Sequence, residues 1–79
     1  MRWEDRITID DAILAGKPIV KGTRISVEFV VGLLARGWTV EHILREYDQL
    51  VLEDIQACLK YASEKLRPDD DGGGAALTA

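Results

Sequence analysis

Residues 16–26, GKPIVKGTRIS, determine how the N-terminal half of this chain folds. Two glycines and a proline punctuate the stretch, and the apolar pair at 19–20 between them predicts a short strand. An earlier strand is expected at 7–9, where ITI alternates apolar and polar residues. Together they define a β segment over 7–25. Strands this short are not stable alone in water, so they must dock on helices or pair with another chain.

The same stretch carries three cations, at Lys17, Lys21 and Arg24. They are candidates for contacts with DNA phosphates or with the carboxylates of a partner. The alternative is that they are ordinary surface lysines and a structural arginine. GKPIVKGT lacks the glycine spacing and the Lys-Ser/Thr pair of a phosphate loop.

Beyond this stretch, the spacing of apolar residues predicts helices at about 26–36, 40–48 and 52–67. Ser26 and Thr39 are good N-caps for the first two. The expected fold is mainly α: a three-helix bundle with a short N-terminal β segment. Residues 1–67 form a single domain in this interpretation. Residues 68–79, which start with Pro68 and continue with DDDGGG, are expected to be a disordered acidic and glycine-rich tail.

The first helix is apolar on nearly every side, and an evenly apolar helix must be buried on every side. A chain of 79 residues has little material with which to cover it. We therefore expect a homodimer, with an interface formed by Phe29, Val30, Leu33 and Leu34. Gly32, in the middle of this helix, costs about 1 kcal/mol against alanine unless a neighbour approaches the backbone there.

A short helix, a tight turn and a longer helix form the pattern of a helix-turn-helix unit, whose second helix reads the major groove of DNA. The buried stripe of the third helix is predicted to be Leu52, Ile55, Leu59, Ala62 and Leu66. Its outward positions then begin with Glu53, Asp54, Gln56 and Ala57. Gln56, Lys60 and Ser63 are the candidates for groove contacts. The acids at 53 and 54 would repel phosphates, which favours a solvated face instead.

Catalytic chemistry has little support in the sequence. His42 is the only histidine and is expected to be an exposed polar helix residue, which makes a poor metal site. Cys58 has no base to activate it and is expected to be a semi-buried thiol. We therefore expect no catalytic residues, no metal and no cofactor.

The composition points to a reducing compartment, because a single cysteine excludes an internal disulfide. No apolar run approaches the roughly 20 residues that cross a bilayer, and MRWEDR lacks the apolar core of a signal peptide. We expect a cytoplasmic protein without a membrane partner.

Residues 7–66 resemble a family of small prokaryotic proteins, domain of unknown function 433. The resemblance lies in an ordered succession of short motifs, GKP…GTR…G…Y…ED…YA, which starts at Gly16 and ends at Ala62. It implies a homeodomain-like helical fold with an N-terminal β segment. One departure concerns the cap of the last helix. Where the family tends to place threonine, this chain has Val51, which cannot cap.

The resemblance also implies a role as the antitoxin of a type II toxin–antitoxin pair, similar to VapB-type antitoxins. The partner would then be a PIN-like nuclease encoded by a neighbouring gene, and promoter DNA would be a further ligand. The alternative is a dimeric protein–protein interaction module with no role in nucleic-acid binding.

Overall fold

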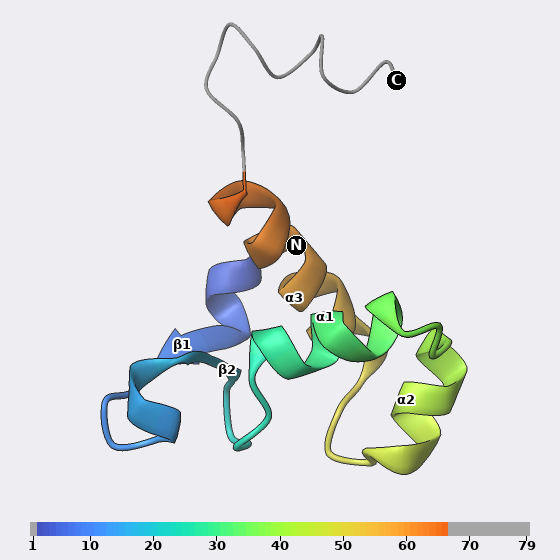
Figure 1. The fold of residues 1–79 in the computed structure, drawn as a ribbon. Coiled ribbons are helices and arrows are strands. Elements are labelled where there is room, and N and C mark those ends of the chain that lie inside the picture. Colours follow the sequence, from blue (N-terminus) through green and yellow to red (C-terminus); the bar gives the residue numbers. More distant parts are fainter. Residues whose placement is uncertain (1, 67–79) are drawn as a thin grey trace, which may run out of the picture.

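A two-stranded antiparallel sheet and three helices make up the structure, a computed structural model that describes residues 2–66 (Figure 1). The tail expected at 68–79 lies outside the described residues. The predicted mainly α fold with a short N-terminal β segment is confirmed. In chain order the elements are the 3₁₀ turn η1 (Trp3–Asp5), β1 (Ile7–Ile9), the 3₁₀ turn η2 (Leu14–Gly16), β2 (Pro18–Val20), α1 (Val27–Ala35), α2 (Val40–Glu46) and α3 (Leu52–Lys65).

The two strands pair with each other, with Ile7 opposite Val20 and Ile9 opposite Pro18. Ile7, Val20 and Ile19 are buried, and the strands contact the helices α1 and α3. Of the two alternatives that the sequence left open for such short strands, the structure therefore has docking on the helices.

The turn after β2 holds the basic stretch in a fixed shape. Gly22 has a φ of +79°, a conformation that favours glycine. The Thr23 hydroxyl donates to the Val20 carbonyl and accepts from the Ile25 amide, both at 2.9 Å. The Val20 amide in turn donates to the Ile25 carbonyl at 2.9 Å. These bonds return the chain to the start of α1.

Local capping sets the start of α1 and α2. The Ser26 hydroxyl accepts from the Phe29 amide at 2.9 Å, and the Thr39 hydroxyl accepts from the His42 amide at 3.0 Å. Both predicted N-caps are confirmed. The helices end one or two residues before the predicted positions, as is common for helix termini.

One side of α1 belongs to the core of a single copy, although the helix is apolar all round. Val30 is 0% exposed and Leu33 4% exposed, and both pack with residues of the sheet, α2 and α3. They therefore have almost no surface left for a second copy, although both were predicted to lie in a dimer interface. Phe29 is exposed and Leu34 half-buried.

The N-terminal turn η1 is fastened to the far end of α3. The Trp3 ring meets Tyr61 edge-on, with 4.8 Å between ring centroids. Its indole Nε1 donates to Glu64 Oε1 at 2.8 Å. Trp3 therefore packs within its own chain.

Candidate interaction surface

The start of α3 is organised around a buried carboxylate. Asp54 is only 6% exposed. Its Oδ1 accepts from Arg6 Nη1 and its Oδ2 from the Val51 amide, both at 3.0 Å. Asp54 thus satisfies a backbone donor at the helix start, where the side chain of Val51 offers no acceptor.

This pairing sets the rotation of α3, and the predicted buried stripe is wrong in part. Asp54 and Ala57 were expected to point outward, but both are buried, together with Ile55 and Cys58. The physical reason is that Asp54 must reach Arg6, and the small side chain of Ala57 then lies in the core.

Three leucines that were predicted to be buried instead face solvent, two of them in α3 and the third, Leu66, directly after it. Leu52, Leu59 and Leu66 are 44%, 45% and 79% exposed. They recur every seven residues, or about two helical turns, so they share one side of the helix. We call these residues the leucine line. The seven-residue spacing is visible in the sequence, but nothing local says that this side faces solvent.

The three candidates for groove contacts lie beside the leucine line. Gln56, Lys60 and Ser63 are exposed on α3, at positions that helical spacing brings to one face. Lys60 Nζ lies 3.7 Å from Glu64 Oε2, a weak exposed ion pair. The outward face of α3 is thus a mixed surface of apolar and polar side chains.

The basic residues of the stretch 16–26 are placed on other elements. Lys17 Nζ pairs with Glu28 Oε1 at 3.0 Å, and both side chains are largely exposed. Lys21 and Arg24 are exposed at the turn after β2. Within residues 2–66, no hydrogen bond or ion pair joins these cations to α3. The six predicted contact residues therefore divide into two groups.

An aromatic cluster at the junction of α1 and α2 was missed by the sequence analysis. Trp38 stacks flat on His42, with 4.0 Å between ring centroids and 6° between planes. Tyr47 meets Phe29 edge-on at 5.5 Å. His42 is therefore half-buried against an aromatic ring, and was wrongly expected to be an exposed polar residue.

Cys58 is expected to be unreactive in the folded protein. Burial raises the pKa of its thiol to about 12, and the charge of the nearby Asp54 adds to the rise. Since the thiolate is the reactive form, a disulfide reagent at pH 8 should modify native protein only after unfolding. The measurement is the rate of colour release from Ellman's reagent with and without guanidinium. Equal rates in the two samples would contradict this assignment.

No group of three or more metal-ligating side chains occurs in the described part of the chain. None of the helices within residues 2–66 is long and apolar enough to span a bilayer. The candidate surfaces are the leucine line with its polar neighbours, the basic turn and the exposed side of α1.

Comparison with known proteins gives one family and two relatives. Residues 7–62 match the model of a family described as "Protein of unknown function (DUF433)". A protein of Sinorhizobium fredii named "Uncharacterized protein y4eO" is 38% identical over 56 residues, which are 71% of this chain. The match spans only 25% of that relative. A crystal structure of a DUF433 member protein from Anabaena variabilis has a TM-score of 0.73 and 27% identity, covering 80% of this chain and 61% of that one.

Proposed function

This chain belongs to the DUF433 family, whose function is unknown, and we propose that it is a non-enzymatic binding protein, the antitoxin of a type II toxin–antitoxin pair. The leucine line on α3 carries the proposal. Exposed leucines at regular helical spacing are typical of a helix that lays one side in the groove of a partner protein. The antitoxin role itself comes from the family resemblance.

The polar neighbours of the leucine line suit the rim of such an interface. Gln56 and Ser63 offer hydrogen bonds and Lys60 offers a charge at positions that remain exposed in the isolated protein. Apolar anchors surrounded by polar groups are the usual arrangement of a specific protein interface. The partner proposed from the resemblance is a PIN-like nuclease.

A second activity, binding of promoter DNA, is supported by the turn after β2. Lys21 and Arg24 are exposed there, and neither has an ion-pair partner within residues 2–66. The hydrogen bonds of Thr23 hold the turn in one shape, so the turn loses little conformational entropy when it binds phosphates. The withdrawal of Asp54 into the core also removes one of the two acids expected to face DNA.

Replacing Leu59 with aspartate is expected to weaken binding of the proposed PIN-like nuclease partner by about 100-fold, since a charge would enter an apolar groove without a partner. Calorimetric titration of the two purified proteins measures the change. Leu14→Asp is the matched control, because Leu14 is also an exposed leucine but lies in η2. Equal losses in both variants, or none in Leu59→Asp with the fold intact, would overturn the proposed contact.

Binding to promoter DNA is the property that distinguishes the proposed antitoxin from the alternative protein–protein interaction module. A regulator should shift its own promoter at low salt, alone or with the nuclease, and the shift should weaken steeply as salt rises because counterions are released. Binding of the nuclease without any DNA shift would favour the alternative module.

A further inference from the structure

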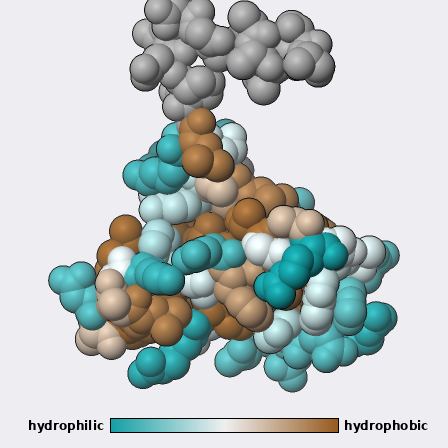
Figure 2. Space-filling model, viewed as in Figure 1, coloured by the Kyte–Doolittle hydropathy of each residue, from teal (hydrophilic) through white to brown (hydrophobic). Residues whose placement is uncertain are grey.

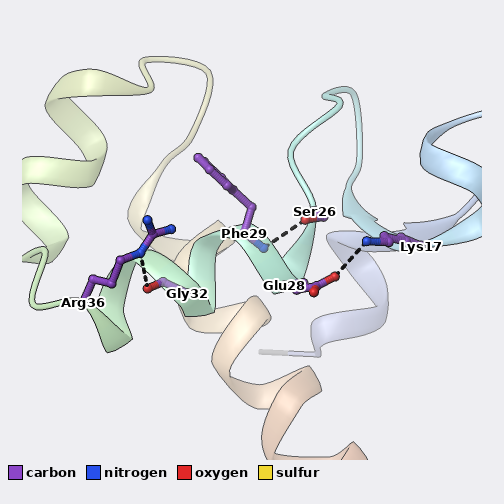
Figure 3. Close-up of a pocket in the computed structure, with 6 residues that line it drawn as sticks. All are labelled: Lys17, Ser26, Glu28, Phe29, Gly32 and Arg36. Carbon is purple, nitrogen blue, oxygen red and sulfur yellow. Dashed lines mark hydrogen bonds and ion pairs between the residues drawn. The ribbon is translucent and has the colours of Figure 1, made fainter.

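The exposed side of α1 carries two opposite charges at equal distances from Gly32. Glu28, Gly32 and Arg36 follow one another at intervals of four residues, so they form one row along the helix. Phe29 and Ala35 flank the row and are exposed. Figure 3 shows Glu28 and Arg36 on opposite sides of Gly32.

Gly32 has no explanation within a single copy. Its backbone does not have a positive φ. A Cβ atom there would meet only Arg36 Nη2, at an ordinary contact distance of 3.9 Å. Alanine would therefore fit, and glycine lowers helix propensity at this position. A glycine in the middle of an exposed helix face instead leaves room for another backbone to come close.

Open grooves lie on both sides of the row. One, of about 440 Å³, is apolar and runs between α1 and the end of α3; its lining includes Val31, Ala35, Tyr61, Ala62 and Leu66. Hydrophobic surface from the end of α3 toward α1 is visible in Figure 2. The other, of about 420 Å³, is more polar and is lined in part by Lys17, Phe29 and Arg36.

We propose that α1 packs antiparallel against α1 of a second copy, about a twofold axis that passes between the two Gly32 residues. In that arrangement, residues of the row through Gly32 that lie equally far on either side of it face each other across the axis. The interhelical ridges would be the rows of residues four apart, which is the commonest way for two helices to pack.

Charge complementarity identifies the occupant as a second copy. Glu28 precedes Gly32 by four residues and Arg36 follows it by four, so Glu28 meets the partner's Arg36, and the symmetry repeats the pair. Within residues 2–66 Arg36 has no carboxylate at ion-pair distance, and its Nε makes only a long 3.4 Å bond to the Gly32 carbonyl. Lys17, 3.0 Å from Glu28, would extend the pair into a network.

The proposed interface replaces the buried Val30 and Leu33 of the interface predicted from sequence with the row through Gly32, which Phe29 borders on one side.

Charge reversal tests this dimer with the protein alone, so the result is independent of the proposed function. Glu28→Arg or Arg36→Glu places like charges together twice across the axis, and each should raise the dimer Kd by at least about 100-fold. The double variant Glu28→Arg/Arg36→Glu restores both pairs in reversed sense but places an arginine beside Lys17, so it should dimerise much more tightly than either single variant and less tightly than the wild type. Sedimentation equilibrium over a range of concentrations measures all four Kd values.

Two further variants serve as a control and as a second test of the interface. Lys21→Glu makes a charge reversal like that of Arg36→Glu but lies in the turn after β2, and should leave the dimer intact. Gly32→Leu should abolish the dimer while circular dichroism shows an undiminished helix content, because its Cβ has room within one copy. A monomeric wild type, a dimer that survives both single reversals, or a double variant no better than the singles would overturn the proposal.

Discussion

Replacing Arg6 with leucine is expected to destabilise the protein by about 3 kcal/mol, because it leaves the buried carboxylate of Asp54 without a counter-ion. The value is set at the low end of the usual range, since Arg6 is itself partly exposed. A chain of 79 residues is expected to have about 4–12 kcal/mol in all. Urea unfolding followed by circular dichroism should therefore show a much lower midpoint.

The matched control for Arg6→Leu is the double variant Arg6→Leu/Asp54→Asn. Asparagine carries no charge but keeps an oxygen that can accept from the Val51 amide. The double variant should therefore be more stable than Arg6→Leu alone. If it is equally unstable, the cost arises from lost packing of Arg6 and not from an unpaired buried charge.

Replacing Ile43 with alanine is expected to cost about 3 kcal/mol through the cavity it leaves. Ile43 is the only fully buried residue among the seven of α2. Besides Ile43, the half-buried Val40 and Leu44 connect this helix to the core. The loss of stability should therefore be largest in α2, the first helix of the α2–turn–α3 unit. Hydrogen exchange should show faster exchange of the α2 amides than of those in α3.

Glu41→Ala provides the control for Ile43→Ala, since it removes an exposed side chain from the same helix. Its effect on stability should stay within about 0.5 kcal/mol. Equal exchange rates of α2 and α3 amides in Ile43→Ala would show that the two helices unfold only as one unit.

Features governed by neighbouring residues could be predicted from the sequence. The caps at Ser26 and Thr39 depend on an oxygen three residues from the amide it serves, and both appear as expected. The two strands and the mainly α fold also follow from local spacing and turn residues.

Features governed by distant residues could not be predicted. The rotation of α3 depends on Asp54 reaching Arg6, 48 positions away in the sequence. Without that pair, the leucines are the natural choice for the buried stripe by apolar spacing alone. The same limit applies to α1, because which of its apolar residues are covered depends on the sheet and α3.

The contact of Trp3 with Tyr61 and Glu64 has a topological consequence. It brings the first and last described elements of the fold together. The segment formed by residues 2–66, whose first and last elements are adjacent in space, can therefore be circularly permuted, or inserted into a host loop, without stretching its connections. The same adjacency means that any bulky group fused ahead of Trp3 would emerge beside the last turn of α3.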